Sequence, residues 1–206
     1  MNRPLRIAVA DDEPDMRDYF RKILPRLGHQ VVAAAGTGRE LLELCRAAGP
    51  DLVITDIRMP DLDGIDAATL LYQERPVPVI LVSAYHDPEL IARAGADHIL
   101  GYLVKPIKQS DLGPAIALAL RRFEQFEALR REAADLRQAL EDRKVIERAK
   151  GLLMRRAGLD EQEAFRRLQK VAMDGNRRLI EVAHMVLTAE EALQPTRRCS
   201  RSRLSA

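Results

Sequence analysis

The stretch DLVITDIRMPDLDG (residues 51–64) joins an aliphatic run to an aspartate and then to a turn rich in Pro, Asp and Gly. A short apolar run closed by turn residues is typical of a strand buried on both faces. Asp56 stands where this strand is expected to end. In an open parallel sheet, ligands bind outside the carboxyl ends of the strands, so the ends of the other strands are the places to search for partners of Asp56.

Four similar aliphatic runs lie in the first half of the chain, at residues 5–10, 30–35, 77–83 and 99–104. Amphipathic stretches of helical length separate the runs, for example from Pro14 and from Gly38, and each is closed by Gly or Pro. Apolar strands that alternate with helices indicate a parallel sheet covered on both faces. The pattern predicts an α/β domain with a doubly wound, five-stranded parallel sheet.

Polar residues break the apolar pattern at the expected strand ends. Asp11 and Asp12 follow the first strand, Asp56 the third, Ser83 ends the fourth, and Lys105 follows the fifth. Three neighbouring carboxylates repel one another unless a cation neutralises them, and a hard divalent ion such as Mg²⁺ suits them. Asp56 could then attack a phosphoryl group while the metal and Lys105 absorb charge and Ser83 donates a hydrogen bond.

Taken singly, each of these residues has an ordinary structural explanation. Asp11 or Asp12 could begin a helix, Asp56 could belong to a turn, and Lys105 could be a solvated charge at a strand end. Tyr102 in isolation is most simply a half-buried aromatic residue of a strand. Five such coincidences at one edge of one sheet are a weaker explanation than a shared site.

Length and composition favour two domains without a membrane segment. The 206 residues carry a formal net charge of +2, and residues 123–206 hold 18 Lys and Arg against 14 Asp and Glu. This excess is compatible with a nucleic-acid partner but does not establish one. No apolar run approaches the roughly 20 residues of a membrane span, so we expect a cytoplasmic protein with no membrane partner. Cys45 and Cys199 show no metal-ligand spacing and are interpreted as free thiols.

The chain becomes rich in helix formers after about residue 110. Leu129, Ala133, Leu136 and Leu140 are spaced as in the seam of a coiled coil, but for only two heptads. Residues 123–143 are therefore predicted to form a helical connector. Two alternatives remain open for it: a coiled coil with a second chain, or a helix folded against its own protein.

The remaining pattern predicts a small three-helix bundle over residues 144–194. Asp160 and Glu163 have the spacing of a capping box at a helix start, and Gly175 is expected to end that helix. Asn176 is the expected cap of the last helix. The polar tail 195–206 is expected to be disordered.

Residues 5–122 resemble the receiver domain of two-component response regulators. The motifs that carry the resemblance are ADDE (10–13), TDIRMPDLDG (55–64), VSA (82–84) and YLVKP (102–106). The resemblance implies a flavodoxin-like fold and a regulatory protein rather than an enzyme. It also implies that Asp56 accepts phosphate from a sensor histidine kinase, with self-catalysed phosphorylation and dephosphorylation only.

The same resemblance implies the metal ligands and the switch residues. Asp12 and Asp56 would bind Mg²⁺ directly, Asp11 through water, and Arg58 through its backbone carbonyl. The bond between Lys105 and Pro106 would be cis. Ser83 would move towards the phosphate, and the Tyr102 ring would follow it inward.

Residues 145–187 resemble the ANTAR domain of transcription antitermination regulators. The matching residues are Ala149, Lys150, Gly151, Met154, Ala164, Phe165, Leu168, Met173, Asn176, Arg177 and Ala183. The resemblance implies binding to RNA stem-loops in nascent transcripts, with Lys150, Gly151, Arg177 and Arg178 as candidate contacts. It leaves open which residues touch RNA and whether phosphorylation creates a dimer or releases inhibition.

Physical chemistry alone permits other interpretations of the bundle. It could place one helix in a DNA major groove, or it could bind only proteins, as a phosphorelay component. We interpret Met154 and Phe165 as core residues. Gly151 is interpreted as a device for close packing of two helices, in preference to direct approach of its backbone to RNA.

Overall fold

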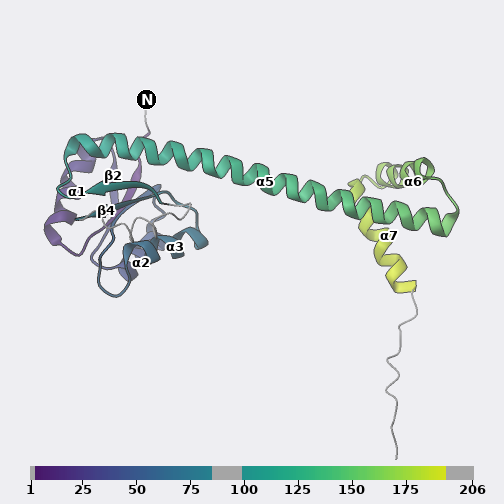
Figure 1. Ribbon diagram of the computed structural model, residues 1–206, viewed down its shortest axis with the longest axis horizontal. Helices are drawn as coiled ribbons and strands as arrows, with labels where there is room; N and C mark the ends of the chain where they lie inside the picture. The colour runs from purple at the N-terminus through teal and green to yellow at the C-terminus, as the bar shows by residue number, and fades with distance from the viewer. Residues whose placement is uncertain (1–2, 85–98, 194–206) are drawn as a thin grey trace, which may run out of the picture. The chain divides into compact units, whose positions relative to one another are not determined.

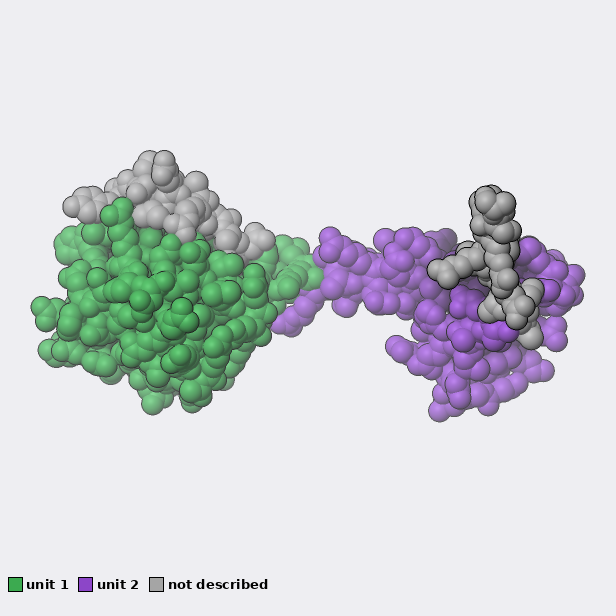
Figure 2. Space-filling model, turned by 90° about the horizontal axis from the view of Figure 1, so that it is seen from below, with its two compact units in different colours: residues 1–130 green, residues 131–206 purple. Residues whose placement is uncertain are grey.

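The computed structural model describes residues 3–84 and 99–193 of the chain (Figure 1). The chain divides into two compact units, residues 1–130 and residues 131–206 (Figure 2). The long helix α5 (Gln109–Ala157) contributes its first part to the first unit and its last part to the second. None of the helices in the described part of the chain is long and apolar enough to cross a membrane.

The first unit contains one parallel sheet in the strand order β2-β1-β3-β4-β5. The strands are β1 (Arg6–Ala10), β2 (Gln30–Ala35), β3 (Leu52–Asp56), β4 (Val79–Ser83) and β5 (Ile99–Val104). The strands lie within one or two residues of the apolar runs in the sequence, which confirms the predicted doubly wound sheet. The order reverses at β1, and this reversal places the carboxyl ends of β1 and β3 beside each other.

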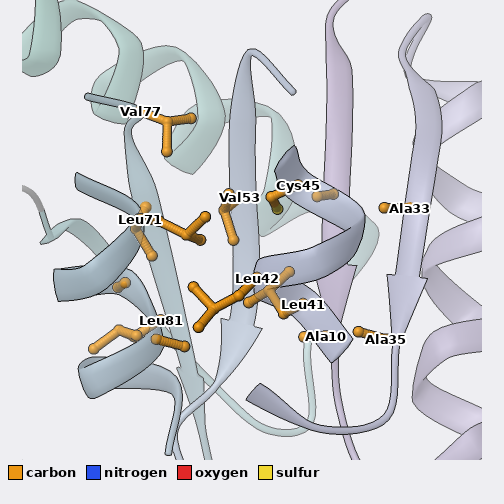
Figure 3. Packing of buried hydrophobic residues seen from close by; sticks show 14 of the residues in the cluster. Ala10, Ala33, Ala35, Leu41, Leu42, Cys45, Val53, Leu71, Val77 and Leu81 are labelled. Carbon is orange, nitrogen blue, oxygen red and sulfur yellow. The ribbon is translucent and has the colours of Figure 1, made fainter. Parts of the chain in front are cut away.

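Helices cover both faces of the sheet (Figure 1). The shorter ones are α1 (Pro14–Arg26), α2 (Gly38–Ala48) and α3 (Gly64–Glu74). On one face, α2 and α3 pack Leu41 and Leu71 against Val53 and Leu81 of the sheet (Figure 3). On the other face, α1 and the start of α5 pack against the alternate strand residues, including Ile54. Burial on both faces explains why the central strands are continuous apolar runs.

The second unit is built from the end of α5, α6 (Glu161–Asp174) and α7 (Leu179–Leu193). Its small core contains Ala149, Leu168, Ala172, Val182 and Ala183. The predicted capping box is confirmed, because the Asp160 side chain accepts a hydrogen bond from the Glu163 amide at 2.8 Å and the Glu163 carboxylate accepts one from the Asp160 amide at 3.2 Å. These bonds satisfy two amides that the first turn of a helix leaves unpaired.

The prediction that Asn176 caps the last helix is wrong. Helix α7 begins at Leu179, and the Arg178 carbonyl accepts hydrogen bonds from the amides of Glu181 and Val182. Asn176 instead has a φ of 47° in the turn after α6. Asn tolerates this left-handed conformation better than other non-glycine residues, so it serves the reversal of the chain rather than the start of the helix.

The apolar seam predicted within α5 is exposed. Leu129, Leu136 and Leu140 keep 66%, 60% and 58% of their surface accessible, and every residue from 131 to 141 is exposed. This part of the helix therefore packs against no core of the described residues. The structure therefore does not show one of the two alternatives for residues 123–143, namely a helix folded against its own protein.

Candidate functional site

The register of the sheet brings together the polar residues at the strand ends. Ala10 of β1 pairs with Thr55 of β3, so Asp11 and Asp56 follow on neighbouring strands. On the other side of β3, the register continues through β4 to β5, where the Lys105 amide donates to the Ser83 carbonyl at 2.9 Å. Residues from four separate sequence segments thus meet at one edge of the sheet.

Three carboxylates and one ammonium group form the centre of this site. Asp11, Asp12 and Asp56 each present a carboxylate oxygen within 4.8 Å of the others. Asp11 and Asp56 are buried, whereas Asp12 is exposed. The Lys105 ammonium nitrogen lies 3.0 Å from Asp11 Oδ2 and 3.8 Å from Asp56 Oδ1.

Burial and like charges disfavour full ionisation of this cluster. Burial raises the pKa of Asp56 to about 6, Lys105 opposes the shift, and Asp11 adds to it. Burial also raises the pKa of Asp11 above its usual range. Burial acts against the charged form of Lys105, but the carboxylates of Asp11 and Glu13 outweigh it and raise the pKa of the ammonium group. The site therefore holds more negative charge than Lys105 alone neutralises.

The donor set fits a hard divalent cation. Asp11 Oδ2 is fully buried and receives no well-aligned hydrogen bond, although Lys105 lies near it. Carboxylate oxygens gathered at this spacing are the ligands that Mg²⁺ prefers, together with water and phosphate oxygens. Asp11, Asp12 and Asp56 are the side chains of the described structure that could hold such an ion.

The turn after Asp56 depends on a glycine. The Gly64 amide donates to the Ile57 carbonyl at 2.8 Å, and a Cβ at Gly64 would lie 1.9 Å from the Asp56 carbonyl oxygen. No other residue fits at this distance without moving the backbone that carries Asp56. Arg58, whose carbonyl is a candidate ligand, lies in the same turn and is exposed.

The sequence analysis did not identify two polar residues that lie near the site, Glu13 and Arg17. Glu13 Oε1 lies 3.0 Å from the Lys105 ammonium nitrogen. Arg17 donates to the carbonyls of Asp11 and Asp12 at 2.6 and 3.0 Å, which fixes the turn that carries both acids. The position of Glu13 in the ADDE motif was an available signal, whereas the role of Arg17 depends on the fold of the loop.

The two proposed switch residues lie in different surroundings. Ser83 is buried at the end of β4. Tyr102 is half-buried and packs against the apolar cluster beneath α2 and α3. The bond between Lys105 and Pro106 is cis, as the resemblance to receiver domains implies. No alternative position of either side chain is part of the structure, so their switching remains a prediction.

In the second unit, Lys150 has partners within the bundle. It keeps only 7% of its surface exposed, and its ammonium nitrogen lies 2.7 Å from Glu161 Oε1 and 3.0 Å from both Glu147 oxygens. It also lies 5.7 Å from the centroid of the Phe165 ring. These contacts tie α5 to the start of α6, and Lys150 as an RNA contact remains a prediction.

The close-packing interpretation of Gly151 is wrong. Among the described residues, a Cβ at this position would meet only Arg155 Nη1, at the ordinary contact distance of 3.5 Å. Met154 was also placed wrongly in the core, since 37% of its surface is exposed. The apolar period of a helix locates its buried face only approximately, and both residues lie at the margin of that face.

Arg177 and Arg178 lie at the turn between α6 and α7 and are both exposed. An Arg177 guanidinium nitrogen lies 3.1 Å from Met185 Sδ, and Arg178 Nε donates to Glu181 Oε1 at 2.9 Å. Both guanidinium groups therefore face solvent while keeping local partners. The structure brings these two candidates together, but Lys150 and Gly151 belong to α5.

Family comparisons match both units. The response regulator receiver domain matches residues 7–117, and the ANTAR domain matches residues 134–187. The transcriptional regulatory protein PdtaR of Mycobacterium tuberculosis (strain H37Rv) is 42% identical over 184 residues, which cover 89% of this chain and 90% of that protein. The positive alginate biosynthesis regulatory protein of Pseudomonas aeruginosa is 35% identical over 119 residues, which cover 57% of this chain and 48% of that protein.

Solved structures resemble the first unit. The response regulator domain of Thermotoga maritima CheB has a TM-score of 0.54 and 28% identity, and the match covers 58% of this chain and 98% of that one. The signal receiver domain of an HD domain-containing protein from Pseudomonas fluorescens has a TM-score of 0.54 and 26% identity, with 60% and 99% covered. With its acidic site, its sheet and its matches in both units, the chain belongs to the response regulators and carries a receiver domain followed by an ANTAR domain.

Proposed function

We propose that this response regulator is phosphorylated on Asp56 by a sensor histidine kinase and then binds RNA stem-loops in nascent transcripts, so that transcription continues past a terminator. The observation that carries the proposal is the presence, in one chain, of the Asp56–Lys105 acidic site and an ANTAR domain. The proposal places the protein in the cytoplasm, where nascent transcripts are made.

The residues around Asp56 suit phosphoryl transfer. A carboxylate oxygen of Asp56 attacks the phosphorus of a phosphohistidine, the bond between phosphorus and the imidazole nitrogen breaks, and an acyl phosphate forms. Lys105 neutralises charge on the transferred oxygens, and the Ser83 hydroxyl donates a hydrogen bond to one of them. Bound Mg²⁺, held by Asp11, Asp12, Asp56 and the Arg58 carbonyl, would supply further neutralisation. Water later hydrolyses the acyl phosphate, which resets the regulator.

Several features of the second unit support RNA as the partner. Arg166, Arg167 and Lys170 on α6 are exposed, as are Arg177 and Arg178 in the turn that follows. Arginine binds phosphate oxygens and stacks on unpaired bases, both of which an RNA loop displays. The ANTAR match covers this whole region. In the proposed mechanism, phosphorylation shifts the population of receiver conformations towards one that permits RNA binding.

A DNA-binding regulator is the second candidate. The matched relative is named a transcriptional regulatory protein, a name that does not distinguish the two nucleic acids. A regulator of this kind would place one bundle helix in a major groove and prefer duplex promoter DNA. A protein-binding phosphorelay component would bind neither nucleic acid above a salt-sensitive background.

We also propose that the exposed α5 seam pairs with the same seam of a second copy. Leu136 and Leu140 are 60% and 58% exposed, and helices with apolar residues at this spacing associate as coiled coils. Two chains would then present two bundles to tandem stem-loops. Sedimentation of the phosphorylated protein tests this pairing: Leu136→Lys should lower the dimer fraction, with Arg137→Lys as the control.

The decisive test compares binding of the full-length protein to a stem-loop RNA and to duplex DNA at moderate salt. Each is measured with and without a small phosphodonor and Mg²⁺. The proposal expects binding to the RNA, enhanced by phosphorylation in the wild type but not in Asp56→Asn. Preference for the duplex would favour the DNA-binding candidate, and stable phosphate on an aspartate of Asp56→Asn would show that the phosphoacceptor is misassigned.

A further inference from the structure

The ammonium group of Lys105 makes its hydrogen bond outside the cluster of three aspartates. Lys105 Nζ donates to Glu13 Oε1 at 3.0 Å. It lies equally near to Asp11 Oδ2, at 3.0 Å, but that oxygen receives no well-aligned hydrogen bond in the described part of the chain. It lies 3.8 Å from Asp56 Oδ1, which is beyond hydrogen-bond distance. The carboxylate that gives Lys105 a defined direction is therefore Glu13 and not the phosphoacceptor candidate.

The start of α1 does not account for the side chain of Glu13. Glu13 is the N-cap residue of this helix, yet its carboxylate accepts no hydrogen bond from the helix amides. Ser, Thr, Asp and Asn are preferred at this position because their short side chains reach those amides. The Glu13 backbone carbonyl accepts hydrogen bonds from the amides of Met16 and Arg17 at 3.2 and 3.3 Å. The backbone thus begins the helix, and the longer side chain is left to reach Lys105.

The backbone of Glu13 is fixed relative to the site. Its amide donates to Asp11 Oδ1 at 3.0 Å. Arg17 donates to the carbonyls of Asp11 and Asp12, which holds the turn between β1 and α1. Lys105 follows β5, and two strands separate β5 from β1 in the sheet. The hydrogen bond between Glu13 and Lys105 therefore spans the site from one side to the other.

The partners of Lys105 differ in exposure. The Glu13 side chain is 62% exposed, whereas that of Lys105 is 14% exposed and those of Asp11 and Asp56 are buried. An ion pair with an exposed partner is weak and is easily exchanged for a stronger one. A phosphoryl group at Asp56 would carry between one and two negative charges and accept charge-assisted hydrogen bonds. Such a group can therefore take Lys105 from Glu13, but only by breaking an existing contact.

We propose that Glu13 is a positioning residue, which holds Lys105 in the unphosphorylated protein and competes for it with the phosphoryl group on Asp56. This inference rests on the proposed phosphorylation of Asp56 and adds a residue that sets how readily the phosphorylated state forms. Before transfer, the Lys105 ammonium group stays with Glu13. After transfer, it donates to a phosphoryl oxygen, and the Glu13 carboxylate returns to solvent. Removal of Glu13 should therefore favour an anion at Asp56.

The test measures binding of beryllofluoride, which attaches to an aspartate carboxylate and imitates its phosphoryl group. Full-length protein is used at saturating Mg²⁺, and the fluorine NMR signal of the bound group gives the affinity. Glu13→Gln keeps the length of the side chain but removes its charge. It should bind beryllofluoride roughly three- to fivefold more tightly than the wild type, because the competing ion pair is an exposed one. Phosphorylation by a small phosphodonor, followed by intact mass, should accelerate by a similar factor.

The affinity for Mg²⁺ distinguishes this role from a purely structural one. Glu13→Gln should bind Mg²⁺ no more tightly than the wild type, since it removes a nearby negative charge and frees Lys105 to approach Asp11 and Asp56. The anion should therefore bind more tightly while the cation does not. If the substitution only loosened the turn that carries Asp11 and Asp12, both affinities would fall, and the proposal would be wrong.

Two further variants separate the contact from net charge. Asp15→Asn removes an exposed carboxylate from the first turn of α1 that does not contact Lys105, and it should change beryllofluoride affinity less than twofold. Glu13→Asp keeps the charge, but it is shorter and is a preferred cap residue, so it should gain affinity as Glu13→Gln does. An equal gain in Asp15→Asn, or wild-type affinity in Glu13→Asp, would show that charge acts without the contact and would overturn the proposal.

The outcomes also separate this proposal from the proposed function. If the wild type did not bind beryllofluoride, or if Asp56→Asn bound it equally well, phosphorylation of Asp56 itself would be contradicted. If the wild type binds it at Asp56 and Glu13→Gln binds it no more tightly, the proposed function stands and the role of Glu13 fails. Urea unfolding of each variant confirms that the receiver is folded.

Discussion

Tyr72 near the end of α3 donates a hydrogen bond to Glu127 of α5, 55 residues further along the chain, with an oxygen–oxygen distance of 3.1 Å. Arg130 donates to the Tyr72 hydroxyl at 2.8 Å, and its guanidinium carbon lies 5.5 Å from the centroid of the ring. Burial and the Glu127 carboxylate raise the pKa of Tyr72. These contacts attach α5 to the receiver just before the boundary of the first unit.

We expect Tyr72→Phe to destabilise the receiver by about 1–2 kcal/mol, because it leaves Glu127 and Arg130 without a shared partner. Chemical denaturation followed by tyrosine fluorescence measures this effect, since the chain has no Trp and all four Tyr precede residue 131. A double-mutant cycle with Glu127→Gln should show coupling. If the two substitutions changed the free energy of unfolding by strictly additive amounts, the hydrogen bond between Tyr72 and Glu127 would contribute nothing to stability.

Asp56→Asn should raise the stability of the receiver in the absence of divalent ions, by about 1–3 kcal/mol. The amide keeps the shape of the side chain but removes a buried negative charge beside Asp11 and Asp12. Urea unfolding in EDTA measures the difference. Asp18→Asn, which changes an exposed carboxylate, is the control.

Addition of Mg²⁺ should make the wild-type receiver more stable than Asp56→Asn, which reverses the order expected without the ion. The ion binds the folded wild type through three carboxylates and stabilises it by mass action, whereas the variant has lost one ligand. Equal stabilisation of both proteins by Mg²⁺ would indicate that Asp56 is not a ligand.

Asp160→Ala should cost the bundle about 1 kcal/mol, because the capping box loses its side-chain acceptor. Hydrogen exchange of the amides in the first turn of α6 should accelerate, with the Glu163 amide most affected. Asp174→Ala, at the opposite end of the same helix, is the matched control and should be neutral or slightly stabilising. Unchanged exchange at Glu163 would show that the cap does not hold the helix start.

Cys45 should resist alkylation in the folded protein. It lies on the buried face of α2, and burial raises the pKa of its thiol to about 12. Above about pH 9 the unfolded state loses the thiol proton of Cys45, whereas the folded state still keeps it. The free energy of unfolding should therefore fall as the pH rises above about 9. Iodoacetamide labelling of Cys199→Ser at pH 8, with and without urea, isolates the reaction of Cys45. Rapid labelling without urea would contradict its burial.

The sequence was sufficient for features that depend on local periodicity or on one short motif. The strands were found because apolar runs bounded by turn residues have few other solutions. The α6 capping box was found because Asp160 and Glu163 lie three residues apart and need only each other. The acidic residues were found because parallel strands present their carboxyl ends at one edge.

The sequence was insufficient wherever the answer depended on residues far apart in the chain. The pairing of Glu13 with Lys105 spans 92 residues and exists only because β1 and β5 end at the same edge of the sheet. The start of α7 at Leu179 depends on how the chain turns at Asn176, which capping propensity alone did not reveal. Local preference is weak against tertiary context at such positions.

The sequence by itself thus determined the alternation of strands and helices, the phosphoacceptor candidate Asp56, and the family of both units. Only the tertiary structure decided that Lys150 is held by Glu147 and Glu161 and that Gly151 opens into a groove rather than packing against a helix. The physical reason is that composition and spacing specify which face of a helix is apolar. The neighbours that a given side chain meets are set by how α5, α6 and α7 pack together.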